Sequence, residues 1–254
     1  MAEGRDRAAT VLATQGLSRN FGGLAAVREV SIALQHGELH AVIGPNGAGK
    51  TTLVNLLAGA LKPSAGRIVL DGRDVAGAPP WRMARLGVGR SFQRTNILAN
   101  LSVLENVRLA VQAVSRVHNP LRRAESRPDF RARAEATLLR VGLGALAGRE
   151  AGTLSHGEQR QLEIAMALAG DAKVLLLDEP LAGMGVEETQ RMVELLRALA
   201  REHAVLLIEH DMDVVFAVAD WMTVMAEGSV LAAGRPEAIR ANARVQDAYL
   251  GGHA

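Results

Sequence analysis

The sequence predicts an α/β protein with a parallel or mixed sheet, an N-terminal antiparallel β subdomain and an inserted α-helical subdomain. Three observations lead to this prediction. A glycine-rich loop at 44–51 lies between a strand pattern and a helix pattern. Helix and strand patterns alternate over 162–208, as in parallel sheets that are covered by helices. Between these two regions, 101–146 carries helix patterns without strand patterns.

The N-terminal part of the chain carries the patterns of several strands. Apolar and β-branched residues between turn signals predict strands at Val11–Ser18, Val30–Leu34, Glu38–Ile43 and Arg67–Leu70. The first two flank Phe21-Gly22-Gly23, and the last is closed by the turn Asp71-Gly72. The third leads directly into the glycine-rich loop.

This loop reads Gly44-Pro45-Asn46-Gly47-Ala48-Gly49-Lys50-Thr51 and precedes a helix-competent stretch, Thr52–Ala58. Glycines let the backbone curl so that several N–H groups point at one oxyanion, and the following helix adds the positive end of its dipole. Lys50 is suited to neutralise the β- and γ-phosphates, and Thr51 to offer a hydroxyl to Mg²⁺. The loop therefore predicts a P-loop NTPase core.

The later part of the chain alternates between helix and strand patterns. Helices are predicted at Leu162–Ala169 and Glu187–Arg201, and strands at Lys173–Leu177 and Val205–Ile208. Leucine and other apolar residues at helical spacing give the second helix one buried face. Within 101–146, helices are predicted around Leu104–Val111 and from Phe130 to Val141, joined by a basic bridge. A tail begins after Gly234.

Composition limits the possible functions. At 254 residues with 48% apolar residues, the chain is long enough for one large domain with a real core. A net charge of +2 without a clustered basic patch argues against a nucleic-acid partner. The absence of cysteine excludes disulfides and thiolate metal sites and fits the cytosol. Met1–Thr10 carries no apolar signal segment, and no apolar run is long enough to span a membrane, so a soluble protein is expected.

A second set of residues narrows the class of nucleotide enzyme. Four apolar residues, Val174 to Leu177, lead into Asp178 and Glu179. Asp178 at the end of a buried strand is suited to hold the Mg²⁺ water shell beside Thr51. Glu179 is suited to polarise an attacking water. The pair therefore predicts hydrolysis in addition to binding.

Two further residues, Ser155 and His210, become candidate site residues only when they are considered together with the phosphate loop. Ser155 precedes an apolar helix and has Glu158 three residues later, the pattern of a capping box. A capping role and a phosphate-binding role are compatible, because helix N-termini attract phosphate. His210 follows the strand pattern Val205–Ile208 and is a candidate sensor of the γ-phosphate.

The order of these elements over essentially the whole chain resembles the ATP-binding cassette ATPases of ABC transporters. Leu154–Gln159 is similar to the signature motif, and Val174–Glu179 to the Walker B strand. The resemblance implies ATP and Mg²⁺ as cofactors. It places adenine on Phe21, the triphosphate on the Walker A residues Gly44, Pro45, Asn46, Gly47, Ala48, Gly49, Lys50, Thr51 and Thr52, and the metal near Thr51, Gln93 and Asp178. Catalysis is then assigned to Lys50, Glu179 and the switch histidine His210.

The resemblance also implies that two cassettes share each nucleotide. Ser155, Gly157 and Gln159 would contact the ATP held by a second cassette, in a homo- or heterodimer, and closure on ATP would drive the transmembrane permease subunits. Two departures stand out. His156 occupies a signature position where glycine is commonest. Gly185 stands where the loop after Walker B usually has aspartate, so the carboxylate that usually makes the polar contact of that loop is missing at this position.

Several stretches resemble the ATPases of branched-chain amino-acid importers, among them Phe21–Val27, Glu209–Met212 and Ala248–Gly251. Urea or short-chain amide importers and lipopolysaccharide-export ATPases remain alternatives at this stage. A soluble cassette ATPase acting on DNA or ribosomes lacks its expected coiled coil or second cassette here. A phosphate-loop kinase offers no reason for the signature motif.

The resemblance implies a single ABC ATPase domain over 1–254. Its α/β core is expected at 1–92 and 147–254, its helical subdomain at 93–146 and its tail at 235–254. The expected location is peripheral, at the cytoplasmic face of the inner membrane. The expected partners are permease subunits, a second cassette and a periplasmic substrate-binding protein, with no nucleic acid.

Overall fold

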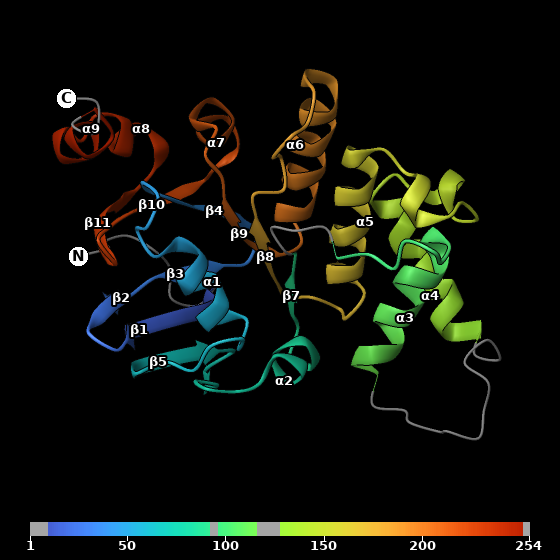
Figure 1. The fold of residues 1–254 in the computed structure, drawn as a ribbon, viewed down its shortest axis with the longest axis horizontal. Coiled ribbons are helices and arrows are strands. Elements are labelled where there is room, and N and C mark those ends of the chain that lie inside the picture. Colours follow the sequence, from blue (N-terminus) through green and yellow to red (C-terminus); the bar gives the residue numbers. More distant parts are fainter. Residues whose placement is uncertain (1–9, 92–95, 116–127, 251–254) are drawn as a thin grey trace.

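The computed structural model describes residues 10–91, 96–115 and 128–250. Two sheets and a set of covering helices make up the molecule (Figure 1). The predicted Gln93 lies outside the described residues, as does most of the basic bridge between the two inserted helices.

The N-terminal sheet is antiparallel throughout. It contains β1 (Thr10–Phe21), β2 (Leu24–Val30), β3 (Ala33–Gln35), β5 (Ala65–Leu70) and β6 (Arg73–Asp74). Its order is β2-β1-β5-β6, with β3 also paired to β1. The prediction of one continuous strand over Val30–Leu34 is wrong, because β2 ends at Val30 and β3 begins only at Ala33, so Ser31 and Ile32 interrupt the strand. The Thr14 side chain bonds to the backbone on both sides of this interruption: its Oγ1 donates to the Val30 carbonyl at 2.9 Å and accepts from the Ile32 N–H at 3.0 Å.

The second sheet is mixed and carries the phosphate loop near its centre. Its order is β11-β10-β4-β9-β8-β7, with all neighbours parallel except the hairpin of β10 and β11. Its strands are β4 (Glu38–Ile43), β7 (Val88–Arg90), β8 (Val174–Asp178), β9 (Ala204–Ile208), β10 (Trp221–Ala226) and β11 (Ser229–Gly234). β4, β8 and β9 confirm predicted strands, whereas β7, β10 and β11 were not predicted.

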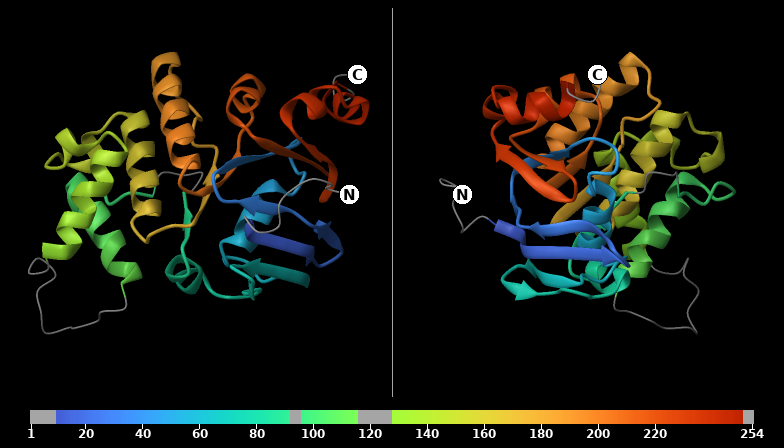
Figure 2. Two further views of the ribbon diagram at one scale, coloured as in Figure 1. Left: turned by 180° about the vertical axis from the view of Figure 1, so that it is seen from behind. Right: turned by 60° about the vertical axis from the view of Figure 1, so that its left-hand side comes forward.

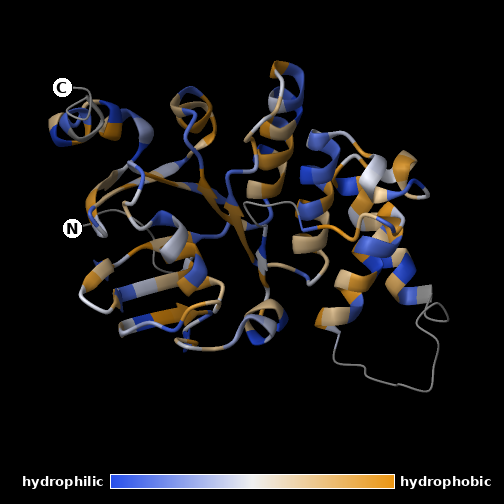
Figure 3. Ribbon diagram, in the orientation of Figure 1, coloured by the Kyte–Doolittle hydropathy of each residue, from blue (hydrophilic) through white to orange (hydrophobic). Residues whose placement is uncertain are grey.

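Alternate residues of the central strands pack on opposite faces of this sheet. On β8, Val174 and Leu176 face the antiparallel sheet and α1 (Lys50–Leu57). Leu175 and Leu177 face α5 (His156–Leu168) and α6 (Val186–Ala200). Figure 3 shows the apolar character of these strands. Because both faces are covered, the strands read as continuous apolar runs.

Of the remaining helices, α3 (Val103–Val114) and α4 (Pro128–Arg140) lie at one end of the molecule and α8 (Pro236–Arg240) and α9 (Ala243–Leu250) at the other (Figures 1 and 2). α3 and α4 pack together and against α5, with Val107, Val111 and Leu138 buried. α7 (Met212–Val218), α8 and α9 lie near β10 and β11, and α2 (Pro80–Arg85) precedes β7. No helix in the described ranges has both the length and the apolar character needed to cross a bilayer.

Candidate functional site

Two glycines of the loop 44–51, Gly44 and Gly49, leave no room for a Cβ. Gly44 and Gly49 have φ angles of 153° and 96°. A Cβ at Gly44 would lie 2.1 Å from the Met225 carbonyl oxygen, and one at Gly49 would lie 2.3 Å from that of Ala26. Gly49 is also the N-cap of α1, so the loop curls directly into the helix N-terminus. The backbone is therefore held as a cradle for an anion.

A cleft of about 600 Å³ opens above this cradle. The structure brings together ten of the predicted site residues as its lining: Phe21, Asn46, Gly47, Ala48, Gly49, Lys50, Thr51, Thr52, Glu179 and His210. The hairpin after Phe21 and the turn at Glu227 and Gly228 close the other side. Gly44, Pro45 and Asp178 are not among its lining residues.

Lys50 is buried at 7% exposure within this cleft. Its Nζ donates to the carbonyl oxygens of Gly44 at 2.7 Å and Pro45 at 3.0 Å. Burial lowers the pKa of Lys50, and the carboxylates of Glu179 and Asp178 oppose that shift. The ammonium group is thus held over the cradle by the loop itself, in position to meet phosphate oxygens.

Asp178 is 1% exposed at the end of β8. Neither carboxylate oxygen has a hydrogen-bond partner among the described residues. Burial, and then the neighbouring Glu179, raises the pKa of Asp178. Buried carboxylate oxygens that lack donors fit a cation and its water shell.

The donor set near Asp178 indicates which metal would fit. No three His, Cys, Asp or Glu side chains of the described segments cluster as a metal site. Thr51 supplies a hydroxyl beside the loop. One carboxylate and one hydroxyl suit Mg²⁺, which keeps several waters and takes its other ligands from phosphates.

Glu179 and His210 face each other across the ends of two paired strands. Asp178 pairs with Ile208 in the register of β8 and β9, so the following residues meet. His210 Nε2 lies 2.6 Å from Glu179 Oε1, and the Glu179 N–H donates to the Ile208 carbonyl at 2.9 Å. Glu179 adopts a φ of 52°, a conformation that non-glycine residues favour only where function or context requires it.

Glu209 is a functional candidate that sequence reasoning missed. It is 5% exposed, and burial raises its pKa. Its Oε1 accepts from the Leu181 N–H at 2.7 Å, and its Oε2 accepts from the His210 N–H at 3.2 Å. The carboxylate therefore ties together the segments that carry Glu179 and His210. A charged residue directly after an apolar strand was the available signal.

Phe21 lies at the rim of the cleft and is 43% exposed. The guanidinium of Arg19 sits over its ring, 4.6 Å from the centroid, which was not predicted. A cation on one face leaves the other face for stacking with a base.

The predicted signature residues lie away from this cleft, since neither Ser155 nor Gly157 nor Gln159 lines it. The predicted capping box is confirmed. Ser155 Oγ accepts from the Glu158 N–H at 3.2 Å, and Glu158 Oε2 accepts from the Ser155 N–H at 2.8 Å. Gln159 Nε2 donates to the Leu154 carbonyl at 3.2 Å.

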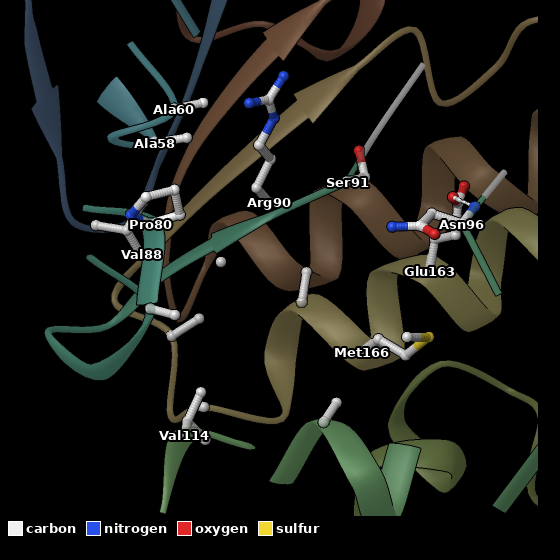
Figure 4. Close-up of a pocket in the computed structure, with 16 residues that line it drawn as sticks. Ala58, Ala60, Pro80, Val88, Arg90, Ser91, Asn96, Val114, Glu163 and Met166 are labelled. Atoms are coloured by element: carbon white, nitrogen blue, oxygen red, sulfur yellow. Dashed lines mark hydrogen bonds between the residues drawn. The ribbon is translucent and has the colours of Figure 1, made fainter. Parts of the chain in front are cut away.

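A second cavity, of about 310 Å³, lies between β7, α3 and α5 (Figure 4). Arg90 and Ser91 line it from the strand, and Met166 lines it from α5. At one end the Asn96 N–H donates to Glu163 Oε1 at 2.7 Å. Ser91 connects this cavity to β8, because its Oγ accepts from the Asp178 N–H at 3.3 Å.

A mostly parallel sheet with a phosphate cradle near its centre and a Glu–His pair at its strand ends defines a P-loop nucleoside triphosphatase. Residues 27–182 match the ABC transporter family, and residues 229–254 match the branched-chain amino acid ATP-binding cassette transporter family. The chain belongs to the ABC transporter family and is an ATP-binding cassette of it.

Relatives of known name are similar over almost the whole chain. The high-affinity branched-chain amino acid transport ATP-binding protein LivG of Salmonella typhimurium is 42% identical, with 95% of this chain and 98% of LivG covered. BraF of Pseudomonas aeruginosa, of the same description, is 41% identical with the same coverage.

Solved structures of cassettes share the fold. The ADP conformation of an ATP-binding cassette of an ABC transporter superimposes with a TM-score of 0.85 at 29% identity, covering 95% of this chain and 99% of that one. A nucleotide-free cassette gives 0.84 at 28% identity, covering 94% and 98%.

Proposed function

We propose that this chain is the ATP-hydrolysing subunit of an ABC importer of branched-chain amino acids. The observation that best supports ATP hydrolysis is the contact of Glu179 with His210 in the cleft above the phosphate loop. Branched-chain amino acids are supported by the names of relatives 41–42% identical along the chain and by the C-terminal family match. That match favours them over urea, amides or lipopolysaccharide.

Each site residue has its own role in the proposed hydrolysis of ATP. Glu179 takes the proton of the attacking water, and His210, which contacts the Glu179 carboxylate, senses the γ-phosphate. Lys50 and the N–H groups of the loop hold the β- and γ-phosphates, while adenine stacks on Phe21. Mg²⁺ would be held by Thr51 and Asp178, with Gln93 nearby, and supplies charge neutralisation on the phosphates.

Each ATP is shared by two cassettes in this proposal. Ser155, Gly157 and Gln159 lie outside the cleft that contains Lys50, so a nucleotide that they contact would be one held by another cassette. The second cassette is another copy of this chain or a related one.

The permease partner is assigned to the cavity lined by Arg90, Ser91 and Met166. Ser91 and Asn96, which line this cavity, flank 92–95 in the sequence. The resemblance to ABC cassettes implies that Gln93, within that stretch, touches the permease. The chain would then work at the cytoplasmic face of the inner membrane, with a periplasmic binding protein delivering substrate. One domain over 1–254 is proposed, with the α/β core at 1–92 and 147–254 and the helical subdomain at 93–146.

Reconstitution tests the proposal. The chain, its second cassette and its permeases are placed in vesicles with a purified candidate binding protein. Leucine-loaded binding protein is expected to stimulate ATP hydrolysis, and the same assay with urea or acetamide is expected to remain basal. Stimulation by urea or acetamide, or no stimulation by leucine, would contradict the substrate assignment.

A further inference from the structure

The carboxylate of Glu188 occupies the N-terminus of α5, where the proposed signature contact would form. Ser155 Oγ donates to Glu188 Oε1 at 3.2 Å. A Cβ at Gly157 would lie 2.8 Å from the same oxygen, so the carboxylate rests directly on this glycine. The two residues proposed to reach another cassette's ATP therefore both face Glu188 in the single cassette.

The contact resembles an anion bound at a helix N-terminus. The first N–H groups of a helix have no partners within it, and the dipole favours negative charge there. The Ser155 hydroxyl already accepts from the Glu158 N–H, so its proton is directed at the carboxylate. A phosphate oxygen arriving at Ser155 would compete for that same proton.

Glu188 also reaches the loop that departs from the family pattern. It stands in the first turn of α6, and its Oε2 accepts from the Gly185 N–H at 3.4 Å. Gly185 stands where aspartate is typical, so Glu188 supplies the carboxylate in this region. One side chain thus joins the loop after β8 to the N-terminus of α5.

We infer that Glu188 is an internal place-holder for phosphate: in the unpaired cassette, its carboxylate occupies the N-terminus of α5. This carboxylate must be displaced when ATP bound to a second cassette arrives there. This inference rests on the proposed sharing of ATP. Displacing a carboxylate from a helix N-terminus opposes closure, so closure requires more ATP than it would without Glu188.

The first test uses the full chain in the Glu179→Gln background, where ATP-bound dimers are expected to persist. The fraction of dimer is measured by sedimentation against ATP concentration. Adding Glu188→Gln is expected to lower the half-maximal ATP concentration by about threefold, the scale of a charge at a helix end. Glu187→Gln removes the same charge from the exposed neighbouring position and is expected to leave it unchanged. An equal or higher ATP requirement with Glu188→Gln would overturn the inference.

A second measurement does not depend on dimers and separates the two proposals. Inorganic phosphate is titrated into the isolated chain while the backbone amide resonances of 155–158 are followed by NMR. With Glu188→Ala these resonances are expected to shift at phosphate concentrations that leave the parent unchanged. Equal behaviour of parent and variant would overturn the place-holder role. One outcome would contradict the shared ATP site and still support the place-holder role of Glu188. In it, phosphate shifts the amide resonances of the variant only, and neither the parent nor the variant forms an ATP-dependent dimer.

Discussion

His210 Nε2 lies 2.6 Å from Glu179 Oε1, although 31 residues separate the two in the chain. They meet because β8 and β9 are neighbours in the sheet and each residue follows its strand by one or two positions. The sheet register, rather than any local motif, therefore sets the distance between the proposed base and the proposed γ-phosphate sensor.

Replacing Glu179 by Gln should stop turnover while preserving nucleotide affinity. The amide keeps the shape but cannot accept the proton of the attacking water, so the hydrolysis rate should fall about 100-fold or more. Phosphate release and equilibrium binding of a fluorescent ATP analogue measure the two properties. Hydrolysis at the parent rate would remove Glu179 from the role of base.

Lys50→Ala should weaken ATP binding instead. The substitution removes the ammonium that the loop carbonyls hold over the cradle, and charged hydrogen bonds of this kind contribute enough for about a tenfold loss of affinity. Lys62→Ala removes the same charge from an exposed position and serves as the control. Equal ATP affinities of the two variants would count against the phosphate-loop assignment.

Ser155→Arg should block hydrolysis without abolishing ATP binding to the single cassette. The larger, positively charged arginine side chain would occupy the space in front of the N-terminus of α5. Ser155 does not line the cleft around Lys50, so ATP binding there should persist. Sedimentation with ATP and a hydrolysis assay together report the effect. Retained hydrolysis would argue against the shared site.

Glu209→Gln should lower the turnover number and leave the KM for ATP nearly unchanged. Both carboxylate oxygens accept backbone N–H groups, and an amide can offer only one acceptor oxygen to them. The Leu181 or the His210 N–H would then face an NH₂ group, and the Glu179–His210 contact should loosen. Glu209→Ala serves as the second variant. Parental kinetics in both would rule out a positioning role.

Two glycines of the phosphate loop should differ sharply in their tolerance of alanine. Gly47→Ala meets no atom within 4 Å and should cost about 1–2 kcal/mol, the penalty of a left-handed φ. Gly49→Ala would also clash with the Ala26 backbone and should cost more than about 3 kcal/mol. Thermal unfolding of the two variants gives the comparison, and similar melting temperatures would show that this contact relaxes freely.

Features written into short stretches of sequence could be predicted. The phosphate loop, the apolar strand before Asp178 and the capping box at Ser155 are all local patterns, and the structure confirms them. The interruption at Ser31 could not be predicted from a local pattern, since the Thr14 side chain that bonds to the backbone on both sides of it lies 17 residues away in the chain.

Contacts between distant elements also escaped sequence analysis. The carboxylate of Glu188 reaches Ser155 across 33 residues, and that of Glu209 reaches Leu181 across 28. Such contacts depend on how α5, α6 and the strand ends pack, and a single sequence carries no periodic signal for them. The hairpin of β10 and β11 was missed because its short strands carry small and polar residues beside apolar ones.

The strand order has a consequence for engineering the cassette. The stretch 27–182 contains β4 and β8, but the position between them is filled by β9, which comes later in the chain. A fragment ending at residue 182 would leave three strand edges unpaired, both edges of β4 and one edge of β8, because β10 also comes after that residue. The smallest unit that folds must therefore extend at least through β10, which pairs with β4 and whose Met225 carbonyl packs against Gly44.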